Sequence, residues 1–168
     1  PLYSSAASDV YKRQELNHAS IIDGCRLSHA NTLVFRHNDM DPLAHLLDSC
    51  RGYENRLIVV DSVFSMDGDI APLDEISTLA RQHKAWMMVD EAHATGVFGP
   101  NGAGIAEEFN LSSEIEIQMG TLSKALGGSG GYVAGSRELV NWLINRARSF
   151  VYSTALPPPP HCSRTARI

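Results

Sequence analysis

The sequence has few cysteines, no long apolar run and no excess of basic residues. Its 168 residues include three widely spaced cysteines, Cys25, Cys50 and Cys162, and none of them belongs to a C-x-x-C pair. Neither a zinc site nor a disulfide framework is therefore expected, and no metal ligand set is predicted. Cysteines of this kind are typical of reduced thiols in a cytoplasmic protein.

The missing apolar run and the missing basic charge each exclude a class of protein. No apolar stretch approaches the roughly 20 residues that a membrane-spanning helix needs, and the first residues lack the sustained apolar core of a signal peptide. The formal net charge is -5 at pH 7, whereas a general nucleic-acid binder normally carries a basic face. We therefore expect neither a membrane nor a nucleic acid as a partner.

The composition that is present, 43% apolar and 20% charged residues, is ordinary for one globular domain. The two ends lack the pattern of the interior. The start of the chain is small and polar without a clear period, and four prolines near the end precede a segment without a recognisable pattern. We expect residues 1–14 to be foreign or disordered, residues 15–156 to form the domain and residues 157–168 to be an irregular tail.

Helix-like and strand-like segments alternate through this domain. Helical spacing of apolar residues predicts helices over 18–28, 39–50, 71–84 and 136–149. Asp39 or Asp41 can cap the second helix, Pro42 suits its first turn, and Ser136 is a good N-cap for the last. The expected apolar sides are Ile21, Ile22, Cys25 and Leu27 in the first helix and Leu139, Val140, Leu143, Ile144 and Ala147 in the last.

Strand patterns lie between these helices, over 31–37, 56–61, 85–93, 114–120 and 131–135. The alternation predicts an α/β fold, with a mostly parallel sheet and helices on both faces. In such sheets ligands bind beyond the carboxyl ends of the strands. Polar residues directly after the apolar runs are therefore candidates for one shared site, and they fall in the segments 61–65, 90–93 and 120–124.

Lys124 is the only lysine in the second half of the chain, and small residues surround it in GTLSKALGGSGG. Small neighbours would let a flat ligand approach, and partial burial or a nearby cation would favour the deprotonated amine, which can attack a carbonyl. A lysine together with an acid such as Asp90 is what a pyridoxal-phosphate site requires, because one binds the aldehyde and the other faces the pyridine nitrogen. Thr121, Ser123 and the glycine backbone could receive the phosphate.

Each of these residues also has a purely structural explanation. Asp90 could cap a helix or form an ion pair, His93 could be a structural histidine, and Lys124 could be a solvated loop lysine. The string DEAH at 90–93 also occurs in nucleic-acid helicases, but a nucleoside-triphosphate hydrolase requires a G-x-x-x-x-G-K-[ST] loop, and the sequence has none. A catalytically silent binding domain with the same sheet is a further alternative.

Five segments, in order along the chain, resemble the α-oxoamine synthases, which are pyridoxal-phosphate enzymes of the fold-type I aminotransferase class. They are NHASIIDGCRLS, VFSMDGDIAPL, VDEAHATGVFGPNGAG, GTLSKALGGSGGYVAGS and RARSFVYSTALPP. The similarity covers about residues 15–157. It implies that residues 15–156 are part of the large domain of that fold, and that further substrate-binding parts belong upstream and downstream.

The resemblance implies roles for individual residues. Lys124 would form the Schiff base with pyridoxal 5'-phosphate and act as general base, while Asp90 would bond the pyridine nitrogen. His18 would stack on the ring as a third catalytic residue. His93 would lie near the phenolic oxygen of the cofactor, and Ser65 would bond the cofactor as well.

Three further implied roles concern the cofactor phosphate. Thr121 would bind it within one subunit, and Ser153 and Thr154 would reach the phosphate of a neighbouring subunit's cofactor. The family forms homodimers with active sites at the subunit interface. Because part of such a site lies outside this chain, we expect the chain alone to be inactive.

Members of the family condense an amino acid with an acyl thioester and release CO₂. Three reactions share these motifs: L-alanine with pimeloyl-CoA or pimeloyl carrier protein, glycine with acetyl-CoA, and glycine with succinyl-CoA. The segments FRHND at 35–39 and RARSFVYSTALPP favour the first reaction. The expected partners are therefore L-alanine and an acyl-CoA or acyl carrier protein.

Overall fold

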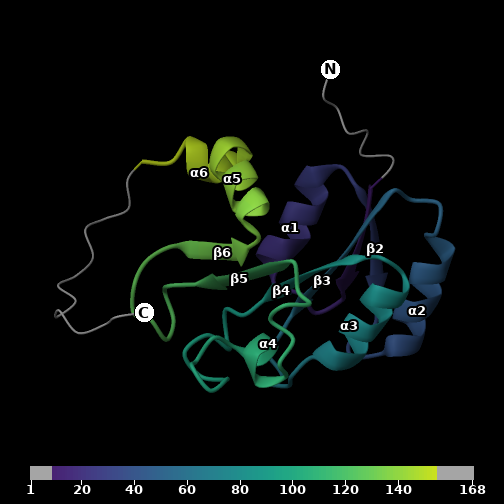
Figure 1. The fold of residues 1–168 in the computed structure, drawn as a ribbon, viewed down its shortest axis with the longest axis horizontal. Coiled ribbons are helices and arrows are strands. Elements are labelled where there is room, and N and C mark those ends of the chain that lie inside the picture. The colour runs from purple at the N-terminus through teal and green to yellow at the C-terminus, as the bar shows by residue number, and fades with distance from the viewer. Residues whose placement is uncertain (1–8, 155–168) are drawn as a thin grey trace.

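The computed structural model describes residues 9–154, which contain one six-stranded sheet in the order β2-β1-β3-β4-β5-β6 (Figure 1). All neighbouring strands are parallel except β5 and β6, which are antiparallel. The strands are β1 (Asp9–Gln14), β2 (Asn31–Phe35), β3 (Asn55–Asp61), β4 (Trp86–Asp90), β5 (Ile117–Thr121) and β6 (Gly131–Gly135).

Helices cover both faces of this sheet. They are α1 (Ala19–Ser28), α2 (Met40–Ser49), α3 (Leu73–Gln82), α4 (Ile105–Glu108), α5 (Arg137–Arg146) and α6 (Arg148–Val151). Figure 1 shows α1, α5 and α6 on one face and α2, α3 and α4 on the other. The predicted fold class is therefore confirmed, and each predicted helix and strand is present with shorter bounds or nearly the same ones.

Alternating side chains of β3 enter two separate cores, because successive residues of a strand point to opposite faces. Ile58 and Val60 pack with the buried apolar residues of α2, α3 and α4. Val59 packs with Ile21 and Cys25 of α1 on the opposite face. Burial of an aliphatic side chain stabilises the fold by roughly 1.5–3 kcal/mol. The two cores therefore stabilise the sheet, in which the ends of β3, β4 and β5 lie side by side.

One detail of the predicted apolar sides is wrong, and the apolar side of α5 is only partly covered. Leu27 is 78% exposed, because it lies two residues beyond buried Cys25 and two residues turn a helix by about 200°. No residue of α5 is buried, although Leu139 and Leu143 are half-buried on its inner side. Within residues 9–154, α5 therefore has its predicted apolar side but only a partial cover for it.

Residues 9–14, which we expected to lie outside the fold, form the strand β1 between β2 and β3. Their side chains alternate between half-buried and buried, and the buried ones are Val10, Lys12 and Gln14. This strand was not predicted because its sequence is polar. Backbone pairing with the neighbouring strands β2 and β3 holds it in the sheet. The expectation that residues 9–14 are disordered is therefore wrong, whereas residues 1–8 and the predicted tail at 157–168 lie outside the described part.

Two further expectations concern membrane spans and thiols. Between residues 9 and 154 no helix has the length and apolar character needed to cross a bilayer. Cys25 and Cys50 are buried free thiols, and Cys162 lies outside the described residues.

Candidate active site

A pocket of about 380 Å³ opens at the carboxyl ends of β3, β4 and β5, where the sequence predicted a site. Backbone bonds hold these ends level: the Ser62 N–H donates to the Asp90 carbonyl over 2.9 Å, and the Glu91 N–H donates to the Met119 carbonyl over 2.7 Å. Six of the eight predicted site residues line this one pocket, namely His18, Ser65, Asp90, His93, Thr121 and Lys124.

Asp90 ends β4 and is 5% exposed. Its Oδ1 accepts a hydrogen bond from the Ala92 N–H over 2.8 Å, which fixes the carboxylate at the start of the following turn. A buried carboxylate is unfavourable without a partner, and Asp90 lines the pocket. A ligand that presents an N–H or a cationic edge can therefore satisfy it.

Asp61 is a second acid of the pocket, and from the sequence it was a candidate only as part of the segment 61–65. It ends β3 and lies in register with Asp90 on the neighbouring strand. Burial, followed by the charge of Asp90, raises the pKa of the Asp61 carboxyl to about 6. The only sequence signal for Asp61 was its place after the apolar run, because its pairing with Asp90 depends on strand register.

His18 stands at the entrance to α1 and caps its N-terminus through the ring. The Ser20 N–H donates to Nδ1 over 3.3 Å, and Nδ1 lies 2.8 Å from the Ser20 hydroxyl. The His18 backbone N–H donates to Asp61 Oδ2 over 3.0 Å. These contacts fix His18, an exposed residue that lines the pocket.

His93 and Lys124 approach the pocket from two different loops. Burial, and next the positive charge of Lys124, lowers the pKa of the His93 imidazole, while Asp90 opposes this shift. The charges of both Lys124 and Asp90 therefore act on His93. Lys124 itself is exposed, so partial burial, one of the two effects considered for its amine, is absent within the described residues.

Hydroxyl groups gather on the loop that carries Lys124. Thr121 Oγ1 lies 2.7 Å from Ser123 Oγ, donates to the Gly130 carbonyl over 3.1 Å and accepts the Ser123 N–H over 3.2 Å. The loop is closed by the Leu122 N–H, which donates to the same Gly130 carbonyl over 2.9 Å. Two hydroxyls and a glycine-rich backbone thus lie together, as the sequence predicted for a phosphate.

Ser65 lies on a short hairpin-like loop between β3 and α3. Val63 and Ile70 form an isolated antiparallel bridge at its base, and the Phe64 N–H donates to the Asp69 carbonyl over 3.0 Å. Phe64 lines the pocket beside Ser65. The position of Ser65 therefore depends on how firmly the base of this loop is held.

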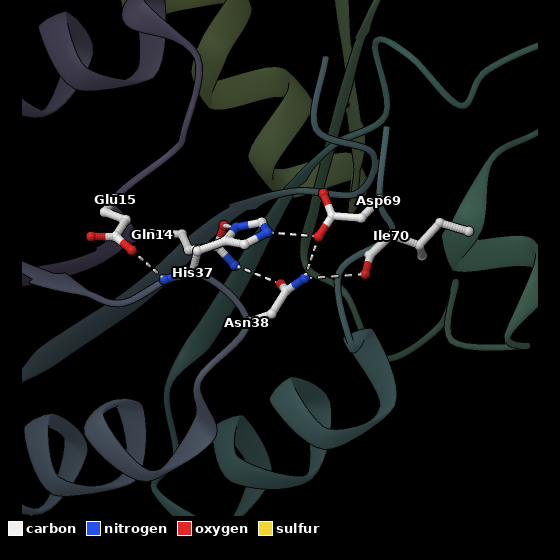
Figure 2. Close-up of polar contacts among 6 residues, drawn as sticks. All are labelled: Gln14, Glu15, His37, Asn38, Asp69 and Ile70. Carbon is white, nitrogen blue, oxygen red and sulfur yellow. Dashed lines mark hydrogen bonds and ion pairs between the residues drawn. The ribbon is translucent and has the colours of Figure 1, made fainter. Parts of the chain in front are cut away.

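A polar network holds that base from the direction of β1 and β2 (Figure 2). His37 Nε2 lies 2.6 Å from Asp69 Oδ2, and Asn38 Nδ2 donates to the same oxygen over 2.8 Å. Gln14 lies 2.9 Å from His37 Nδ1 through Oε1 and donates to Asn38 Oδ1 through Nε2 over 3.0 Å. In the sequence, His37 and Asn38 stood out only as part of FRHND, and this supporting role was not predicted.

Ser153 and Thr154 do not line the pocket. They follow α6 and are exposed, and the Ser153 hydroxyl donates to the Ser149 carbonyl. Their implied role toward a neighbouring subunit stays a prediction. No group of three potential metal ligands occurs among residues 9–154.

Comparison with known proteins gives the same family for nearly the whole chain. A model of the aminotransferase class I and II family matches residues 9–159. The 8-amino-7-oxononanoate synthase of Geobacter sulfurreducens is 57% identical over 150 residues, which are 89% of this chain and 38% of that protein. The chain thus spans well under half the length of this curated relative.

Solved structures agree with the strand order described above. A structure of SPT with PLP, at 37% identity, superposes with a TM-score of 0.86 over 90% of this chain and 38% of that chain. The 8-amino-7-oxononanoate synthase from Francisella tularensis, at 35% identity, gives a TM-score of 0.76 over 89% of this chain and 43% of that chain. With sequence, fold and pocket in agreement, the chain belongs to the aminotransferase class I and II family.

Proposed function

We propose that this chain is part of a pyridoxal-phosphate-dependent 8-amino-7-oxononanoate synthase, an α-oxoamine synthase of biotin biosynthesis. The carrying observation is that Lys124 and Asp90, predicted to bind opposite parts of one cofactor, line the same pocket. The 57% identity to a synthase of that name supports the proposal.

The residues of the pocket fit this cofactor. The volume of about 380 Å³ lies within the range of about 300–1,000 Å³ for small-molecule sites. Asp90 offers a buried carboxylate for the pyridine nitrogen, and the Thr121 and Ser123 hydroxyls suit a phosphate. Lys124 would hold the aldehyde carbon, and the bound cofactor would supply an electron sink for the carbanion formed at the substrate.

The side chains of this chain would then have distinct tasks. Asp90 would favour the protonated ring nitrogen, because an adjacent carboxylate stabilises a cation. His18 would cover one face of the ring, Ser65 would bond the cofactor, and His93 would hold a hydrogen bond at the phenolic oxygen. Once the substrate amino group has taken its place on the aldehyde carbon, Lys124 would be free to remove the proton from the substrate Cα, because it lines the same pocket.

The substrates and the assembly follow from the same proposal. L-Alanine and pimeloyl-CoA, or pimeloyl carrier protein, would be the substrates of the whole enzyme. Glycine with acetyl-CoA or succinyl-CoA is the alternative within the family, and an inactive cofactor-binding domain is the alternative of another class. We further propose a cytoplasmic homodimer in which Ser153 and Thr154 reach the partner's phosphate.

Reduction by borohydride tests the proposal directly. The enzyme that contains this chain should develop a visible absorbance band with pyridoxal phosphate, and borohydride should then attach the cofactor to Lys124, as peptide mass mapping would reveal. Lys124→Ala should abolish the band and the turnover of L-alanine with pimeloyl-CoA. The matched variant Lys84→Ala removes an exposed lysine outside the pocket and should retain both; activity in Lys124→Ala would refute the proposal.

A further inference from the structure

Two carboxylates, rather than one, border the pocket at the ends of neighbouring strands. Asp61 and Asp90 are register partners on parallel β3 and β4, so their side chains leave the sheet on the same side, and adjacent strands are only about 4.8 Å apart. Both line the pocket, and they are 7% and 5% exposed. A single ring nitrogen needs only one acid, so the second carboxylate calls for an explanation.

The carboxylate pair has little internal compensation. Asp61 accepts one backbone N–H from His18 and Asp90 accepts one from Ala92. The Asn17 side chain and the His18 ring also lower the pKa of Asp61, but burial and the charge of Asp90 outweigh them. Among residues 9–154, neither acid forms an ion pair with a lysine, arginine or histidine. Two buried like charges side by side are unfavourable, and a cationic ligand edge would relieve that repulsion.

Asp61 is also tied to the wall of the pocket. Its Oδ2 accepts the backbone N–H of His18, the residue at the entrance to α1 that also lines the pocket. The Asp61 side chain thus connects Asp90, its register partner, with His18. The other titratable groups that line the pocket are His18, Asp90, His93 and Lys124.

We infer that Asp61 is a positioning residue which adds a second negative charge beside Asp90 and anchors His18, so that the pocket selects the cationic, N-protonated form of a flat heterocycle. The inference deepens the proposed function and rests on it, since pyridoxal phosphate is the heterocycle in question. Asp61 acts through Asp90 and His18 rather than by touching the ring nitrogen itself.

The ionisation of Asp61 makes the inference measurable. Its pKa of about 6 means that the second charge is present above pH 6 and disappears below it. Affinity for pyridoxal phosphate should therefore gain a contribution from Asp61 as the pH rises through this value. The cofactor phosphate also titrates near pH 6, but it does so equally in every variant, so the ratio of two dissociation constants isolates Asp61.

The experiment titrates pyridoxal phosphate into the full-length enzyme that contains this chain and follows the visible band at several pH values. Asp61→Asn keeps the shape and an oxygen for the His18 N–H but removes the charge. We expect its dissociation constant to exceed that of the parent by about fivefold or more near pH 8, and by about twofold or less near pH 5. Asp67→Asn, which removes an exposed acid of the same loop, should bind like the parent at both pH values.

Each outcome decides the inference. Equal affinities of parent and Asp61→Asn near pH 8 would overturn it, and so would an equal loss at both pH values, which would indicate a merely structural role. Failure of the parent to carry the cofactor on Lys124 after borohydride reduction would remove the proposed function and this inference together. A normal parent with an unaffected Asp61→Asn variant would remove the inference alone.

Discussion

Gly96 lies against Ala125, where the loop that follows β4 approaches the loop that carries Lys124. A Cβ built on Gly96 would lie 2.8 Å from the Ala125 Cβ, a separation that real Cβ atoms do not adopt without movement of the backbone. Gly96 also has a φ of 82°, which side-chain-bearing residues rarely adopt. The close approach matters because His93 and Lys124, one on each loop, both line the pocket.

Gly96→Ala should therefore separate these loops and displace Lys124. We expect a loss of about 1–3 kcal/mol in the free energy of unfolding, from the strained φ and the clash, together with weaker binding of pyridoxal phosphate. Chemical denaturation and titration of the visible band would measure the two effects. Gly52→Ala is the control: a Cβ there meets nothing within 4 Å, so its stability should stay within about 0.5 kcal/mol.

The local signals in the sequence predicted what depends on local chemistry. Ser136 was predicted as an N-cap, and its hydroxyl accepts the Leu139 N–H over 3.2 Å. Asp39 does occupy the N-cap position of α2, but its side chain makes no capping bond. The apolar runs and the acids after them predicted the pocket, because parallel strands end at the same edge of a sheet.

Features that depend on contacts distant in sequence could not be predicted. The strand β1 has polar residues at two inward positions, Lys12 and Gln14, so its alternation does not match that of a buried strand. Asp61 and Asp90 lie side by side because of the register between β3 and β4. The sequence of either strand alone does not reveal that register. The role of His37 and Asn38 requires that Asp69, more than 30 residues away, folds back beside them.

The network in Figure 2 leads to a prediction about the loop that carries Ser65. Asp69→Ala removes the acceptor of both His37 Nε2 and Asn38 Nδ2. We expect a loss of about 1–3 kcal/mol in the free energy of unfolding, because His37 Nε2 loses its acceptor and Asn38 Nδ2 keeps only the Ile70 carbonyl at 3.5 Å. We also expect a raised dissociation constant for pyridoxal phosphate, because Phe64 and Ser65 are held less firmly.

The matched control is Asp67→Ala, an exposed acid on the same loop, which should change stability by about 0.5 kcal/mol or less. Hydrogen exchange would add a local measure, since the Phe64 N–H bonded to the Asp69 carbonyl should exchange faster in Asp69→Ala only. Unchanged exchange and unchanged affinity in Asp69→Ala would show that the network does not hold the loop.

Lys12 leads to the last prediction, because it is a lysine in the middle of the sheet. Its side chain is fully buried, and its Nζ has no hydrogen-bond partner. Burial lowers the pKa of the Lys12 amine, while the neighbouring Cys50 opposes the shift. An unsatisfied buried amine is a conflict between a local residue and the global fold, at an inward position of β1.

Lys12→Met should accordingly stabilise the protein. The thioether side chain has a similar length and no charge to bury, so we expect a gain of about 1–3 kcal/mol near neutral pH. Lys84→Met makes the same change at an exposed position and should leave stability within about 0.5 kcal/mol of the parent.

The dependence on pH separates the charge of Lys12 from its packing. Because the pKa is lower in the folded state, the unfolded chain binds more protons between the two pKa values, and the stability of the parent rises with pH across that interval. The advantage of Lys12→Met over the parent should therefore be largest near neutral pH and shrink toward about pH 10. Denaturant unfolding at several pH values would measure it, and a constant or growing advantage would assign the gain to packing instead of charge.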